Sequence, residues 1–273
     1  MLKDLIGIQG PRDIQVRDKS VLEKLLEVED RVVKEYVRRV SNYWKENHNN
    51  VYLPLHASLS SELPPYTEQD LQALLLAKEN NGYNGNEAQV LGIYTGVLLH
   101  VLTERCEQEE KSTTFTFDLN ENEFHYLFYF AKRAGEVTVR RVKGNYTCSA
   151  MGSYGGQVEK LVIEQNTGNN AAGWAGGDKG TIGTLLINHN TGNYAAGGAG
   201  SFRGTIGTLL INQNTGNDAA GWAGSDGGTI GTLAFYEAGR NAGEDVKADR
   251  IVTGEEALEL YERLMGEMKC LKT

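Results

Sequence analysis

Hydrophobic residues follow a helical spacing in the first part of the chain. From Ser20 onward an apolar residue recurs every three or four positions as far as Trp44, with charged residues between. That spacing places one apolar stripe along a helix, and it predicts a helix that runs from Ser20 to about Lys45. Ser20 and Glu23 have the spacing of a capping box at its start.

Two further helices are predicted before residue 111. Thr67 begins the first of them, and Asn81-Gly82 ends it. Asn86 is the expected cap of the second, which runs to about Cys106 and is apolar enough to be buried on most sides. Residues 1–111 are therefore predicted to form a helical domain.

The pattern changes after Ser112. Thr114 to Phe117 alternates between polar and apolar residues, as a strand does. Glu123 to Arg133 has the spacing of a short aromatic-rich helix. These two pieces are predicted to form a cap that joins the helices to the segment that follows.

A 24-residue repeat is the strongest pattern in the sequence. QNTGNNAAGWAG begins at Gln165, and related segments begin at His189 and Gln213. The same register extends back to Val137 and forward to Phe235, which makes about five coils of a parallel β-solenoid with degenerate outer coils.

Equivalent positions of successive coils lie above one another in a solenoid, so the repeat predicts ladders of like residues. The three interior ladders are Val137, Leu161, Leu185, Leu209 and Leu233; Val139, Ile163, Ile187, Ile211 and Phe235; and Val158, Ile182, Ile206 and Ile230. Two asparagine ladders, expected to bond to each other and to turn backbone, are Asn166, Asn190 and Asn214, and Asn169, Asn193 and Asn217. Thr181 and Thr184 stand three apart in one strand, which predicts opposite faces for them.

The repeat weakens after Phe235, and a last helix is predicted from Thr253. This helix and the N-terminal helices are expected to cover an end or a flank of the solenoid, because an open sheet edge promotes aggregation. The fold class is therefore α+β: a helical domain (1–111), a parallel β-solenoid with its cap (112–240), and a C-terminal extension and helix (241–273).

The Gly-rich segments resemble a known repeat. Gly144-Asn145-Tyr146, followed by Gly152 and Gly155-Gly156, looks like one turn of the GXGXG right-handed β-helix. That repeat is known from the C-terminal domain of the glutamate synthase large subunit and from one of the subunits of formylmethanofuran dehydrogenase. The resemblance covers about 100 residues, and the coil here is longer than is usual in that family. It implies a structural right-handed β-helix and supplies no catalytic residue.

Composition narrows the possible partners and compartments. The net charge of −9 argues against nucleic acid and anionic membranes, because phosphate binding needs clustered Lys and Arg. No apolar run at the N-terminus has signal-peptide length, and none elsewhere is long enough to cross a bilayer. The three cysteines, Cys106, Cys148 and Cys270, form no CxxC, so a cytoplasmic location is expected.

The histidines show no metal-binding pattern. His48, His56, His100, His125 and His189 share no HxxxH or HxH spacing, so neither a metal nor a cofactor is expected, and His100 is interpreted as a core residue. His56 could act as a base near Ser58, but no oxyanion hole or third partner is indicated. No catalytic residue is therefore predicted.

Trp174 and Trp222 occupy the same repeat position two coils apart, with Gly198 between them. The spacing predicts indoles about 10 Å apart on one face, with a recess over Gly198. If buried, the indoles would anchor a helix; if exposed, they would stack on sugar rings or hold a protein partner. Trp174, Trp222 and Tyr194 are the predicted ligand-binding residues.

The function expected from these observations is a non-enzymatic scaffold or protein-interaction subunit that binds a protein partner or forms a homo-oligomer. The alternative is a carbohydrate-binding or carbohydrate-processing β-helix protein that uses the face of Trp174 and Trp222.

Overall fold

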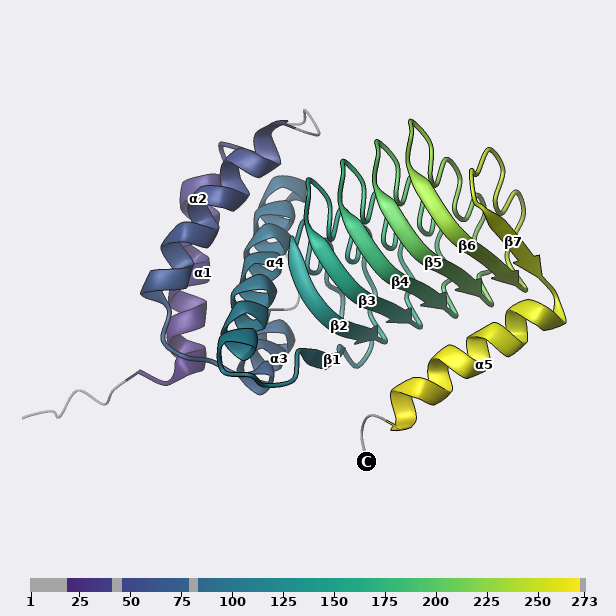
Figure 1. Ribbon diagram of the computed structural model, residues 1–273. Coiled ribbons are helices and arrows are strands. Elements are labelled where there is room, and N and C mark those ends of the chain that lie inside the picture. The colour runs from purple at the N-terminus through teal and green to yellow at the C-terminus, as the bar shows by residue number, and fades with distance from the viewer. Residues whose placement is uncertain (1–18, 41–45, 79–82, 271–273) are drawn as a thin grey trace, which may run out of the picture.

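The computed structural model describes residues 19–40, 46–78 and 83–270. Figure 1 shows four helices at one end of a stack of parallel strands, with a fifth helix beneath the other end. The helices are α1 (Val21–Tyr36), α2 (Glu46–Glu62), α3 (Glu68–Ala77), α4 (Gly85–Gln108) and α5 (Glu255–Cys270). The strands are β1 (Thr114–Asp118), β2 (Arg133–Arg140), β3 (Gln157–Glu164), β4 (Thr181–Asn188), β5 (Thr205–Asn212), β6 (Thr229–Tyr236) and β7 (Arg250–Thr253). The predicted fold class is confirmed.

The first helix is shorter than predicted. Its capping box of Ser20 and Glu23 is present, but α1 ends at Tyr36, and Trp44 and Lys45 lie outside the described residues. A separate helix, α2, follows. The sequence prediction missed it because Pro54, which lacks an N–H donor, stands inside it.

The start of α3 is confirmed, and the start of α4 is corrected. Thr67 caps α3, whose predicted end at Asn81-Gly82 lies outside the described residues. The cap of α4 is Asn84, not Asn86. The reason is a reciprocal pair of bonds: the Asn84 side chain accepts from the Glu87 N–H (3.1 Å), and the Glu87 carboxylate accepts from the Asn84 N–H (2.9 Å).

The strands pair in parallel and in sequence order from β1 to β7. All three predicted interior ladders are confirmed by the pairing register. The first ladder also gains the buried Phe115 before Val137, and at its other end Leu233 pairs with Ile251, which is exposed.

The segment Glu123 to Arg133 is not a helix, contrary to the prediction. It forms turns of the first coil, in which Tyr126, Phe128 and Phe130 have φ of 59°, 52° and 67°. The backbone of the segment bonds to the next coil, as in the bond from the Phe130 N–H to the Ser149 carbonyl (3.1 Å). Aromatic residues at helical spacing thus fill the end of the solenoid core.

A bulge in each long strand changes the predicted threonine faces. The β4–β5 register pairs Ile182 with Ile206 and then Thr184 with Thr208, and it passes over Gly183. Ile182 and Leu185 both belong to the interior core, although they stand three residues apart. Thr181 and Thr184 therefore both lie on the outer face, because the bulge adds one outward residue.

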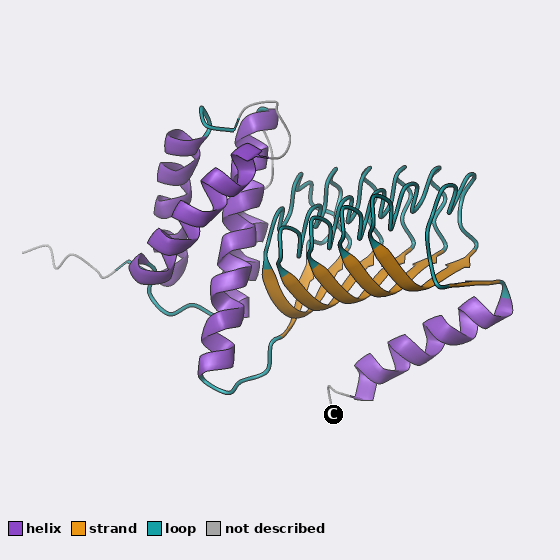
Figure 2. Ribbon diagram, turned by 45° about the horizontal axis from the view of Figure 1, so that its top comes forward, coloured by secondary structure: helices purple, strands orange, loops and turns teal. Residues whose placement is uncertain are grey.

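Helix α5 packs on the outer face of the sheet (Figure 2). A second hydrophobic cluster joins the strands to this helix, and it contains Val162, Leu186, Leu210, Ala234, Val252 and Ala257, with Leu260, Tyr261, Leu264 and Met265 against them. The Asn188 side chain donates to the Tyr261 hydroxyl (3.0 Å). The predicted cover of a flank is confirmed, although Thr253 ends β7 and the helix begins at Glu255.

Helix α4 closes the N-terminal end of the solenoid. One hydrophobic core runs without interruption from the helices into the coils. Gly92 and Gly96 of α4 lie directly against the backbone of the first coil, at Tyr126 and Tyr129. The division into separate domains near residue 111 stays a prediction. None of the helices described is both long and apolar enough to cross a membrane.

Side chains of α3 protect the free edge of β1. Gln72 accepts from the Asp118 N–H (3.0 Å) and donates to the Asp118 carbonyl (2.8 Å). The Glu68 carboxylate accepts from the Thr116 N–H (2.5 Å). These bonds replace those that a neighbouring strand would make, so the edge is not available for pairing.

We expect Gln72→Leu to lower the free energy of unfolding by about 2 kcal/mol, because it leaves a part-buried N–H and C=O without partners. The measurement is a guanidinium chloride titration followed by circular dichroism. Gln69→Leu makes the same change on the exposed face of α3 and should cost less than about 0.5 kcal/mol. Equal losses for the two variants would show that the edge contact contributes nothing.

Candidate functional site

The three predicted ligand-binding residues lie at the surface. Trp174, Tyr194 and Trp222 are 36%, 42% and 57% exposed. They belong to the turn segments that follow β3, β4 and β5. The alternative in which the two Trp residues are buried beneath a helix is therefore wrong, and the face they occupy is open.

The recess predicted over Gly198 is closed. A Cβ atom at Gly198 would lie 2.9 Å from Cε3 of Trp174, so the indole covers this glycine. The indole also stacks on Phe202, with ring centroids 5.7 Å apart and planes at 22°. Because Trp174 leans toward the following coil, it fills the space that the missing side chain leaves.

A cavity of about 270 Å³ lies on the other side of Trp174. Its aromatic lining comes from Tyr129, Phe130, Tyr154 and Trp174, and Ala150 and Asp178 also contribute. Phe130 and Tyr154 pack together with ring centroids 5.0 Å apart. Ala150 holds the repeat position that Trp174 holds in the next coil. This small side chain leaves the space that the cavity occupies beside Trp174.

The cavity wall is apolar even where it contains serines. The Ser149 hydroxyl donates to the Asn170 carbonyl and the Ser153 hydroxyl to the Ala150 carbonyl, each at 2.6 Å. Both hydroxyl protons are thus directed into the backbone. Ligand sites are commonly apolar cavities with a few polar groups, and Asp178 is the charged residue of this lining.

A polar groove of about 580 Å³ continues from this cavity, with Tyr154 and Asp178 common to both. Its charged lining residues are Asp178, Lys179, Arg203 and Asp226. Aromatic surfaces and charged hydrogen-bonding groups therefore lie next to each other. Such a site can hold a ligand with an apolar face and hydroxyl groups at its edge.

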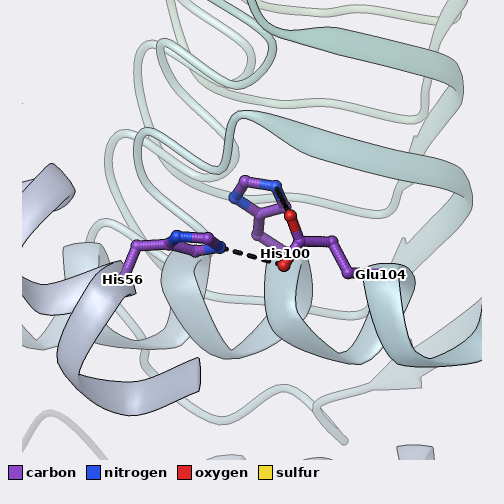
Figure 3. Close-up of side chains that lie close together, drawn as sticks. All are labelled: His56, His100 and Glu104. Carbon is purple, nitrogen blue, oxygen red and sulfur yellow. Dashed lines mark hydrogen bonds and ion pairs between the residues drawn. The ribbon is translucent and has the colours of Figure 1, made fainter. Parts of the chain in front are cut away.

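A second cluster lies between α2 and α4 (Figure 3). Nε2 of His56 is 3.1 Å from one carboxylate oxygen of Glu104, and Nε2 of His100 is 3.2 Å from the other. The two imidazole rings stack with centroids 4.2 Å apart and planes at 23°. One carboxylate thus contacts both rings.

The ring of His100 is held from its far side. The Tyr52 hydroxyl lies 2.8 Å from Nδ1 of His100 and accepts from the Lys132 backbone N–H (3.2 Å). Burial, together with the charges of His56, Arg133 and Lys132, lowers the pKa of His100 to about 3. His100 is therefore neutral near pH 7, as its interpretation as a core residue implies.

The structure does not support His56 as a base for Ser58. Its Nε2 contacts Glu104, and the Ser58 hydroxyl donates to Glu62 (3.4 Å). The meeting of His56 with His100 was missed because the helix that carries His56 was missed. One signal was available: His100 and Glu104 stand four apart, which puts them on one helix face.

The fold and the two sites define a helix-capped parallel β-solenoid with an aromatic cavity on its turn side and a histidine–carboxylate cluster among its helices. Comparison of the chain with protein-family models, curated proteins and solved structures finds no match.

Proposed function

We propose that this chain is a non-enzymatic binding protein that holds carbohydrate on the aromatic face of its solenoid. The observation that carries the proposal is the cavity lined by Trp174, Tyr154 and Phe130, with Asp178 beside them. The apolar faces of sugar rings pack on indole and phenol rings. Their hydroxyl groups need hydrogen-bond acceptors, which Asp178 and the adjoining groove supply.

Trp222, in the same repeat position as Trp174, and the exposed Tyr194 supply further aromatic surface on later coils. Both residues belong to coils that follow the coil of Trp174, and both are more exposed than Trp174. A chain of several sugar units can contact more than one coil, because coils repeat every ~4.8 Å. The surface therefore suits an oligosaccharide better than a single sugar.

A scaffold role is the second candidate. Trp222 is 57% exposed and does not line the aromatic cavity, and Trp and Tyr are typical anchors of protein interfaces. The likeness of the coils to the GXGXG β-helix also favours a structural role for the solenoid.

Cys106 and Cys148 are free thiols, which supports a reducing compartment such as the cytoplasm.

We expect the full chain to bind a subset of oligosaccharides on a glycan array, with affinity then measured by titration of tryptophan fluorescence. Trp174→Ala and Trp222→Ala should each weaken binding about tenfold, equivalent to ~1.4 kcal/mol. Ile251→Ala is the control, because Ile251 is as exposed as Trp222 but lies in β7. An array without signal, or affinities that neither Trp variant changes, would exclude carbohydrate as the ligand.

A further inference from the structure

Three metal-ligand side chains converge between two helices that pack together. His56 comes from α2, and His100 and Glu104 come from successive turns of α4. We propose that these three side chains bind one divalent transition-metal ion of the Zn²⁺ class. Imidazole nitrogen with one carboxylate oxygen is a common donor set for such ions. This proposal is independent of the carbohydrate surface.

The donor atoms are already close to the separation that a metal requires. Ligand atoms of the three residues all lie within 4.8 Å of one another, and the two nitrogen–oxygen contacts are 3.1 and 3.2 Å. Around a tetrahedral zinc with bonds of 2.0–2.1 Å, neighbouring ligand atoms stand about 3.3 Å apart. The two nitrogen atoms and the carboxylate thus stand close enough for one ion to bind between them.

The positions of the donors follow from the packing of α4. His100 and Glu104 stand on one face of this helix, and most residues of α4 between Ala88 and Thr103 are buried. Helix α2 packs along α4 more extensively than along other elements, which brings His56 to the same face. Two of the three donors therefore stand on a backbone that the core fixes.

A second layer of contacts orients His100. Its Nδ1 lies 2.8 Å from the Tyr52 hydroxyl oxygen, which the Lys132 N–H holds from the other side. When Nε2 binds a metal, the imidazole proton resides on Nδ1, and this oxygen can accept it. Such a contact fixes the ring and its tautomer in metal sites.

Solvent reaches the cluster, and one ring must rotate before an ion can bind. The side chains of His56 and Glu104 are 22% and 33% exposed, whereas that of His100 is 13% exposed. Because the rings are stacked, one must rotate before both Nε2 lone pairs point at one ion. His56 is the more exposed ring and can make this rotation, and solvent can then supply a fourth ligand.

The positively charged side chains of Arg133 and Lys132 contact groups other than Glu104. Arg133 forms an ion pair with Glu107 (2.9 Å), and Nζ of Lys132 donates to the Asn49 side chain (2.7 Å). The Glu104 carboxylate contacts the two imidazoles instead. Its negative charge is therefore available to the ion.

The test is calorimetric titration of the full chain with ZnCl₂ after removal of metals with EDTA, repeated with Co²⁺ and its visible absorption spectrum. We expect one ion per chain, and a cobalt spectrum typical of nitrogen and oxygen ligands. His56→Ala and Glu104→Gln should each weaken binding by about 100-fold. Tyr52→Phe should weaken it by roughly 10-fold, as loss of a contact to a ligand does.

His125→Ala is the matched control, because His125 and Glu123 form a two-residue pair at 2.9 Å on the solenoid. It should leave zinc affinity unchanged. Circular dichroism checks that each variant is folded, and Glu104→Gln keeps the shape of the side chain. Absence of saturable binding to the wild-type chain would overturn the proposal, as would zinc binding that persists in both His56→Ala and Glu104→Gln.

Discussion

Asn190→Ala is expected to lower the free energy of unfolding by about 3–5 kcal/mol, although the side chain that it removes is polar. Asn190 is fully buried. Its amide accepts from Asn166 and donates to Asn214 (both 2.7 Å), and it also donates to the Gly192 carbonyl (2.7 Å). Alanine removes all three bonds, and each buried polar group without a partner costs about 1–3 kcal/mol.

The measurement is guanidinium chloride unfolding followed by circular dichroism. Asn193→Ala is the matched control from the second asparagine ladder, which is more exposed. Asn193 accepts from the Asn217 N–H (2.8 Å), and its own N–H bonds to Asn169 (2.8 Å). Alanine removes only the bond that the Asn193 side chain accepts. Because water can replace this bond at the surface, its loss should cost less than about 1 kcal/mol. Similar losses for both variants would show that burial does not distinguish the two ladders.

The solenoid could be predicted because the same pattern of residues recurs every 24 positions along the chain. Val137, Leu161 and the residues that continue their ladder share one position in the 24-residue repeat, and stacking requires them to coincide. The bulge at Gly183 could not be predicted from alternation alone, because two outward residues in succession look like a change of face. The first coil was missed for a related reason: aromatic residues replace the glycines and alanines of later coils, and their spacing imitates a helix.

The candidate sites depend on contacts that local spacing does not encode. The sequence placed Trp174 and Trp222 correctly in one repeat position, but not the tilt of Trp174 over Gly198. That tilt moves the cavity to Ala150, which could have been noticed as a small residue between larger equivalents. His56 and His100 meet only because α2 packs on α4, and helix packing of this kind leaves no periodic signal that joins the two positions.

Gly92→Ala should destabilise the protein by about 3 kcal/mol, although alanine is the better helix former. In an open helix this change gains about 1 kcal/mol. Here a Cβ at Gly92 would lie 2.3 Å from the carbonyl oxygen of Tyr126 and 2.5 Å from its Cβ. Neither atom is at the end of a flexible side chain, so α4 or the first coil must move, and overpacking of a core costs about 1–3 kcal/mol or more.

The matched control is Gly266→Ala in α5, where a Cβ would meet nothing within 4 Å. This variant should raise the melting temperature slightly, whereas Gly92→Ala should lower it, when both are followed by circular dichroism. The opposite signs separate helix propensity from packing, because both variants make the same chemical change in a helix. If Gly92→Ala also raised the melting temperature, α4 would not be seated on the first coil. The closure of the solenoid end by this helix, and with it the continuous core, would then have to be rejected.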